Sequence, residues 1–539
     1  MQMSPASARV AAPPAPSSLT YVEARAAALS GDHSRSAKLF AALAQQSGDE
    51  ALRRQAVTSA IAAGDIPLAL SLARSVPVAR LPLEARLLLI GEELRKRRNN
   101  DAIALTEVPN AGVNLNFLGP FVRSWTAAER KDLGGALGAL DSMPANGFLA
   151  PYREQQRALI LLKLKRAADA LPYVDRSLGE GGIRGQRLRL ALADGLARAG
   201  DRARALSIVQ SMELDGLSAK ERLERRGRLD LGITNASEAF SDMIMAIAVD
   251  LGRDADTELQ VRLLQVARAS DPDNSSAALL LGYFLTREGR TDDGLATLRT
   301  VPDDDLFAAD ARQLQARVLS DARRNAEALT LASGLTARRN ATPDDYQTLA
   351  AILGKAGRNV EAADAYARAI ALATPAAGPD ALWPMYLNRA SALQRAGKWA
   401  EAKKVLEAAL LIAPDEPLLL NNLGYSSLEK GEDLERAEAL IRKAVALAPN
   451  DASITDSLGW ALFKRGKVHD AIDTLQQAAL KNPSEPEIRE HLGDALFTAG
   501  RRYEARFAWS AALVTADEEV AARIKSKLDA GLTPVTAAP

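Results

Sequence analysis

The sequence predicts an all-α fold, a solenoid of consecutive helical hairpins, and two observations carry this prediction. One glycine recurs near the end of the chain at intervals of 34, 35 and 34 residues, at Gly397, Gly431, Gly466 and Gly500. Such a period is typical of a two-helix repeat unit. The composition agrees, because 47% of the 539 residues are hydrophobic but only 4% are aromatic, which suits closely packed helices better than a large β-core.

Each recurring residue has a mechanical role in a hairpin. Glycine lets the chain turn between two antiparallel helices. Small residues follow the turn where the helices cross at close range, and prolines close the first three copies because proline cannot donate inside a helix. These residues are Ala402, Ala437, Ala471 and Ala505, then Ala409, Ala444, Ala478 and Ala512, then Pro414, Pro449 and Pro483. The first helix of the last three copies also carries a Leu-Gly step, at Leu423-Gly424, Leu458-Gly459 and Leu492-Gly493.

This pattern resembles the tetratricopeptide repeat (TPR), a 34-residue unit with Leu-Gly in the first helix, a small residue at the turn, Ala after it and Pro at its end. The resemblance covers residues 386–513, extends to 346–375 and 275–302, and becomes looser upstream. It implies a TPR-type right-handed α-solenoid of about 11 to 13 hairpins.

The chain divides along these lines. We expect a disordered leader at 1–19, N-terminal helical repeats at 20–105, a loop at 106–120, divergent TPR-like repeats at 121–235, middle TPR-like repeats at 236–375, well-formed TPR repeats at 382–514, a capping helix at 515–531 and a tail at 532–539. The apolar segment Glu238–Val249 is expected to be a buried helix rather than a Met-lined ligand groove. In the capping helix, the residues expected on the polar outer side are Glu518, Glu519, Arg523, Lys525 and Lys527.

Composition and the absence of known motifs argue against catalysis, metal binding and nucleic-acid binding. Lys plus Arg equals Asp plus Glu, 68 each, so no basic field attracts nucleic acid. The chain has no cysteine and three histidines, and it lacks the phosphate-loop, zinc-protease and nucleophile-elbow motifs. We therefore predict that the protein is not an enzyme, holds no metal, needs no cofactor and binds no nucleic acid. No apolar run is long enough for a membrane-spanning helix.

The resemblance places a partner-binding groove on the first helices of the repeats. Mapped onto this sequence, the groove residues are Leu387, Arg395, Asn421, Tyr425, Glu429, Asp456, Trp460, Lys464, Glu490, Asp494 and Phe497. Tyr425 and Trp460 are interpreted as aromatic anchors for a peptide. The alternative is that both rings pack between neighbouring first helices. Clamping of a C-terminal carboxylate is not favoured, because Asn421, Asp456 and Glu490 are mostly acceptors.

A narrower resemblance covers residues 420–509. The sequences NNLGY, GEDLERA, DSLGWAL, HLGDAL and RRYEARFAW are similar to the C-terminal region of large bacterial envelope TPR proteins. Many of these are outer-membrane lipoproteins, and one type is an adaptor that binds and activates a carboxy-terminal processing protease. The resemblance implies a periplasmic or outer-membrane-associated protein. The sequence itself shows no signal peptide and no acylatable cysteine, so a soluble protein is expected and the cytoplasm stays as the alternative.

The predicted function is therefore a non-catalytic protein–protein interaction scaffold or adaptor. It would dock an extended or helical partner segment along the groove, and a carboxy-terminal processing protease is the specific partner that the resemblance implies. Two alternatives stay open, a regulatory subunit of an enzyme and a structural homo-oligomer. The oligomeric state is also left open.

Overall fold

The computed structural model describes residues 18–109, 117–144, 146, 150–179, 182–212, 216–251, 257–373 and 378–533. Over these residues the chain is all-α, with thirty α-helices, one 3-10 helix (η1, Val78–Arg80) and no strand, as predicted. Residues 1–17 of the predicted leader, 110–116 of the predicted loop and 534–539 of the predicted tail lie outside the described residues.

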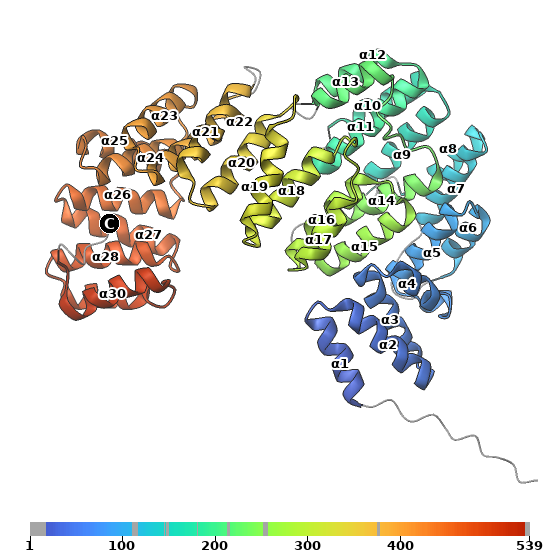
Figure 1. Cartoon of the computed structure of the whole chain (residues 1–539), viewed down its shortest axis with the longest axis horizontal. Coiled ribbons are helices and arrows are strands. Elements are labelled where there is room, and N and C mark those ends of the chain that lie inside the picture. Colours follow the sequence, from blue (N-terminus) through green and yellow to red (C-terminus); the bar gives the residue numbers. More distant parts are fainter. Residues whose placement is uncertain are drawn as a thin grey trace, which may run out of the picture. The chain divides into compact units, whose positions relative to one another are not determined.

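The chain forms two compact units, Met1–Leu331 and Ala332–Pro539, called unit 1 and unit 2 below. The boundary falls inside α19 (Asn325–Thr336) and within the predicted segment 236–375. In each unit, consecutive helices pack as antiparallel pairs (Figure 1).

Unit 1 holds α1 to α18. Their bounds are α1 Ser18–Leu29, α2 His33–Ser47, α3 Glu50–Ala63, α4 Ile66–Ala73, α5 Leu83–Arg95, α6 Asn99–Glu107, α7 Leu118–Glu129, α8 Leu133–Asp141, α9 Ala150–Lys163, α10 Ala167–Ser177, α11 Gly182–Ala199, α12 Arg202–Gln210, α13 Gly216–Arg226, α14 Ala236–Asp250, α15 Thr257–Ser270, α16 Ser275–Arg287, α17 Thr291–Arg299 and α18 Ala308–Asp321.

Unit 2 holds α20 to α30. Their bounds are α20 Pro343–Lys355, α21 Asn359–Leu372, α22 Pro379–Arg395, α23 Trp399–Ile412, α24 Pro417–Glu429, α25 Leu434–Leu447, α26 Ala452–Lys464, α27 Val468–Lys481, α28 Pro486–Thr498, α29 Arg502–Ala512 and α30 Glu518–Ala530.

The turn glycines adopt the conformation that the repeat requires. Gly397, Gly431, Gly466 and Gly500 all have left-handed backbones, with φ between 67° and 81°. The same left-handed turn closes several hairpins of unit 1 without glycine, for example at Lys131 and Lys165, with φ of 62° and 59°. Because these turns have no glycine, the glycine spacing in the sequence does not mark them. The thirty described helices therefore form more hairpins than the glycine spacing indicates.

The Leu-Gly glycines are needed because the second helix of each pair lies very close. A Cβ added to Gly459 would lie 2.5 Å from Leu475 Cγ, and one added to Gly493 would lie 2.3 Å from Trp509 Nε1. No side chain fits at such distances without movement of its neighbours. Both the glycine of the first helix and the buried alanines of the second therefore allow the close crossing.

Unit 1 departs from simple neighbour-on-neighbour stacking. Its helices α14 and α15 pack against α3, α5 and α7, which precede them by a hundred residues or more (Figure 1). Tyr152 Oη donates to Asp250 Oδ2 at 2.5 Å, and the Ala236 N–H donates to Glu129 Oε1 at 2.8 Å. One hydrophobic core consequently runs from Ala37 to Phe307. Helix α14 is buried as predicted, with Met243 and Met245 inside this core.

Candidate partner-binding face

The predicted groove residues fall at recurring positions on the first helices of unit 2. Counted back from each turn glycine, they lie mainly ten, six and two residues before it. The first set is Leu387, Asn421, Asp456 and Glu490, the second is Tyr425, Trp460 and Asp494, and the third is Arg395, Glu429 and Lys464, with Phe497 beside them. We call these positions on α22, α24, α26 and α28 the first-helix face.

Trp460 does not present its ring to a partner in this structure. The side chain is 1% exposed and lies between Phe463 and His491, with ring centroids 5.0 and 4.2 Å away and nearly parallel planes. Its Nε1 donates to Glu429 Oε1 at 2.9 Å. The expectation of an exposed anchor is therefore corrected at Trp460, because packing between adjacent first helices satisfies both the apolar ring and its polar nitrogen.

Asp456 is occupied by His491 from the next repeat. Imidazole Nδ1 lies 3.0 and 2.9 Å from the two carboxylate oxygens, and both side chains are buried. Burial by itself would lower the pKa of His491, but the charge and hydrogen bond of Asp456 outweigh burial and raise it. Asp456 therefore holds α26 to α28 rather than facing solvent.

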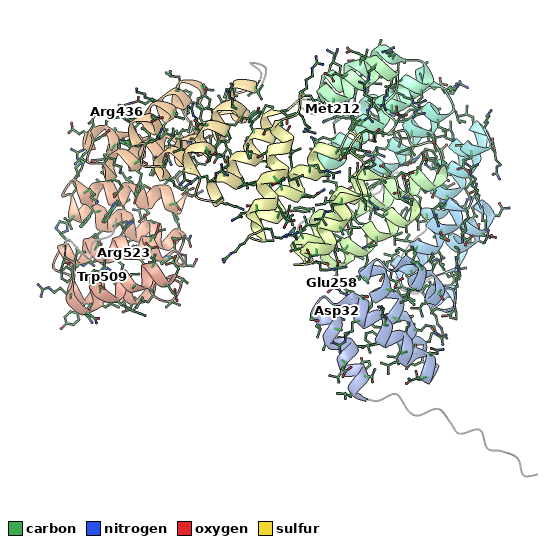
Figure 2. All side chains as sticks on the ribbon, in the orientation of Figure 1. Asp32, Met212, Glu258, Arg436, Trp509 and Arg523 are labelled. Carbon is green, nitrogen blue, oxygen red and sulfur yellow. The ribbon has the colours of Figure 1, made fainter. Side chains whose placement is uncertain are left out.

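Glu490 and Asp494 are covered by α30. Lys527 is 0% exposed, and its Nζ donates to Glu490 Oε1 at 2.6 Å and to the two oxygens of Asp494 at 2.8 and 2.7 Å. Arg523 pairs with both oxygens of Glu490, at 2.8 and 2.7 Å. Trp509 Nε1 also donates to Asp494 Oδ1 at 3.0 Å. Figure 2 marks Trp509 on α29 and Arg523 on α30.

The prediction for the outer side of α30 is thus wrong at Lys527. The sequence pattern treats a lysine as a solvated residue, but this one reaches inward to two buried acids. Phe497, at the edge of the same cluster, is half-buried, with its centroid 5.5 Å from that of Trp509. No period or motif in the sequence marks Lys527 or Arg523 as the partners of α28.

The remaining predicted residues are more accessible. Arg395 and Lys464 are exposed, and Leu387, Asn421, Tyr425 and Glu429 are half-buried. Burial, with the charges of Glu429 and Asp456, raises the pKa of the Tyr425 hydroxyl. The Oδ1 atom of Asn421 is buried and accepts no hydrogen bond among the described residues. Lys464 Nζ lies 4.9 Å from the Trp460 ring centroid and 3.7 Å from Glu429.

The first-helix face therefore has two parts. We call Leu387, Arg395, Asn421 and Tyr425, on α22 and α24, the open part. The closed part is Asp456, Trp460, Glu490, Asp494 and Phe497, on α26 and α28, and it is filled by its own side chains and by α30. Glu429 and Lys464 contact Trp460 and border the closed part. An amide next to a half-buried phenol can bind a peptide backbone and an apolar side chain, and the arrangement offers no nucleophile paired with a base.

Comparison with known proteins agrees with the repeat pattern. Residues 387–452 and 457–521 match one family model described as tetratricopeptide repeat, and residues 261–318 match a second model of the same description. Tetratricopeptide repeats are therefore recognised in residues 261–318, 387–452 and 457–521. No curated protein matches it significantly.

Several solved structures match this chain at low identity and low TM-score. The Cut9–Hcn1 hetero-tetramer of the APC/C matches at 15% identity, with 96% of each chain covered and a TM-score of 0.36. YrrB, described as a TPR protein with an unusual peptide-binding site, matches at 21% over 34% of this chain and 91% of its own, with a TM-score of 0.27. MamA from Desulfovibrio magneticus RS-1 matches at 21% over 32% and 94%, with a TM-score of 0.28.

Two features are absent from the part of the chain that the structure describes. None of the helices there combines the length and apolar character that crossing a bilayer requires. The same part of the chain holds no group of three or more His, Asp or Glu side chains arranged to ligate a metal ion.

Proposed function

We propose that the protein is a non-catalytic scaffold that docks a segment of a partner protein on the open part of the first-helix face of unit 2. Solenoids of helical repeats characteristically bind partners along such surfaces. The TPR matches support an interaction role at this level, and the accessible residues of α22 and α24 support its location.

The observation that carries the proposal is that Tyr425 stays half-buried and Arg395 exposed, whereas the equivalent Trp460 is 1% exposed. Tyr425 lies one helical turn after Asn421 on the same helix, so its half-buried ring is offered to an apolar side chain of a docked segment.

The charges of the open part favour one kind of partner segment over another. Arg395 is exposed at the open part, whereas the carboxylate of Glu429 is already engaged by Trp460 and Lys464. A partner segment with an acidic residue near Arg395 is therefore favoured over a basic one.

The finer proposal is that the partner is a carboxy-terminal processing protease of a bacterial envelope, which this chain would assemble or activate. It rests on the sequence resemblance of residues 420–509 alone. Mixing the purified chain with such a protease, and measuring complex formation by light scattering, tests it separately from the location of the face.

The location is tested by affinity capture from native extracts with Tyr425→Ala and with Tyr503→Ala as the matched control. Tyr503 is 93% exposed on α29, away from the face, so the two variants remove the same ring. Both must retain wild-type helicity by circular dichroism. We expect a partner to be lost with Tyr425→Ala only. Equal retention by both variants would show that the proposed face does not bind, and loss with Tyr503→Ala alone would move the surface to α29.

A further inference from the structure

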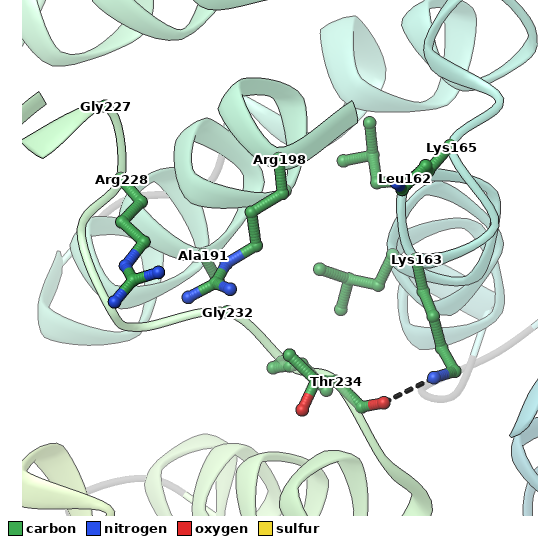
Figure 3. Close-up of a pocket in the computed structure, with 12 residues that line it drawn as sticks. Leu162, Lys163, Lys165, Ala191, Arg198, Gly227, Arg228, Gly232 and Thr234 are labelled. Atoms are coloured by element: carbon green, nitrogen blue, oxygen red, sulfur yellow. Dashed lines mark hydrogen bonds between the residues drawn. The ribbon is translucent and has the colours of Figure 1, made fainter. Parts of the chain in front are cut away.

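Unit 1 contains a cavity of about 420 Å³ that the scaffold function does not use. It lies between α9, α11 and the segment of residues 227–235 that links α13 to α14 (Figure 3). We call these residues the linking segment. A cavity of this size falls in the range of small-molecule pockets, roughly 300 to 1,000 Å³.

The linking segment is fixed on both sides of the cavity. The fully buried carboxylate of Asp194 accepts the Leu229 N–H at 2.6 Å and Arg198 Nε at 2.7 Å. At the other end, Lys163 Nζ donates to the Thr234 carbonyl oxygen (Figure 3). Between them a Cβ added to Gly232 would lie 2.5 Å from Asp194 Oδ2, so the backbone is seated tightly there. The cavity is therefore bounded by a fixed segment.

The lining is cationic. No acidic side chain lines the cavity, but four basic ones do: Lys163, Lys165, Arg198 and Arg228. Two nearby acids are already engaged. Asp194 holds Arg198 and the linking segment, and Asp230 Oδ1 lies 2.6 Å from Arg228 Nε and 3.5 Å from Arg198 Nη2. The four cations of the lining outnumber these two acids. A neighbouring cavity shares Arg198, Gly232, Ile233 and Thr234 with this one and is lined by acids, among them Glu238, which accepts from the Thr234 N–H. The excess of positive charge therefore belongs to the side of Lys163, Lys165 and Arg228.

The two guanidinium groups are adjacent, because both contact the same oxygen of Asp230, and Figure 3 shows them together at one edge of the cavity, with Lys163 at the opposite edge. Paired guanidinium groups match the oxygens of phosphate and carboxylate groups. The rest of the lining includes the apolar side chains of Leu159, Leu162 and Ile233. A ligand that fits both features has an anionic head and a short apolar body.

We propose that this cavity binds a small phosphate monoester with a short aliphatic body. A phosphate monoester carries about −1.5 to −2 charges and three acceptor oxygens at neutral pH, so it can engage more of the four lining cations than a single carboxylate can. The leucines and Ile233 cover the aliphatic part. The site is separate from the first-helix face, so its success or failure leaves the scaffold proposal unaffected.

Isothermal titration of the full chain with n-butyl phosphate, inorganic phosphate and n-butylammonium tests this. The cavity variant is Lys165→Ala with Arg228→Ala, both exposed. The control is Lys131→Ala with Arg225→Ala, which removes the same charge, and Lys131 has the same left-handed backbone as Lys165. We expect the dissociation constant for n-butyl phosphate to rise about tenfold or more in the cavity variant and to stay unchanged in the control.

Any of several results would overturn the proposal: no binding of n-butyl phosphate at millimolar concentration, equal weakening in both variants, or binding of n-butylammonium as tight as that of n-butyl phosphate. If inorganic phosphate bound as tightly as n-butyl phosphate, the proposed contact between the apolar lining and an aliphatic body would be wrong. A capped phosphoserine peptide binding more tightly than n-butyl phosphate would show that the phosphate arrives on a protein instead of a small molecule.

Discussion

Replacement of Lys527 by methionine is expected to release α30 from the end of unit 2 without unfolding the rest of that unit. Methionine keeps the length of the side chain and removes the ammonium group. Lys527 Nζ makes three contacts of 2.6 to 2.8 Å with Glu490 and Asp494, and all three side chains are almost completely buried. The variant leaves the two carboxylates in place without this cation.

The free-energy cost of this substitution depends on the hydrogen bonds that Glu490 and Asp494 retain. Removal of one partner from a buried ion pair costs about 3 to 5 kcal/mol. Glu490 retains the two hydrogen bonds from Arg523, and Asp494 retains the one from Trp509 Nε1, so the lower end of this range applies. A cost of about 3 kcal/mol corresponds to an increase of roughly a hundredfold in the opening constant of α30.

Native-state hydrogen exchange measures this opening directly. Amides of α30 from Ala522 onward should lose about a hundredfold in protection, while those of α20 and α21 in the same unit should keep theirs. Lys525→Met is the control, because Lys525 is exposed on the same helix and the substitution has the same chemistry. A change of less than about threefold in α30, or an equal loss in α20, would refute the reasoning.

Three further predictions concern stability. Gly459→Ala should lower the free energy of unfolding by about 1 to 3 kcal/mol because its Cβ meets Leu475 at 2.5 Å, whereas Gly334→Ala, with nothing within 4 Å, should raise it by up to about 1 kcal/mol; urea titration compares them. Lys131→Gly should stabilise by about 0.5 to 1 kcal/mol, since it relieves a left-handed residue (φ 62°), and an unchanged or lower melting temperature would contradict this. At Glu438, burial raises the pKa but hydrogen bonds from three surrounding cations outweigh it and lower the pKa to about 2. The folded pKa lies below the unfolded value of about 4.5, so its stabilisation of about 3 kcal/mol is present above pH 4.5 and lost as pH falls toward 2, and Glu438→Gln should remove this part of the acid dependence in pH-dependent unfolding.

The repeat, its helices and its turns were predictable from the sequence because they depend on local chemistry. Gly397 and its equivalents indicate a left-handed turn, and small residues at fixed distances indicate a close helix crossing. The TPR character of residues 387–521 was therefore predictable. Where Lys131 takes the place of glycine, the same turn forms without that marker, and the period becomes hard to read.

Which groove positions are open was decided only by the tertiary structure. Trp460 and Tyr425 occupy equivalent positions in successive repeats, yet Trp460 is buried by a histidine 31 residues later and Tyr425 is half-buried. The repeat pattern places Glu490 and Asp494 in the groove, but in the folded chain both are paired with Lys527 of α30. A repeat pattern specifies what each position faces in an ideal unit. It carries no information on which distant side chain arrives to fill that position, because ion pairing and stacking form between elements that come together only in the folded chain.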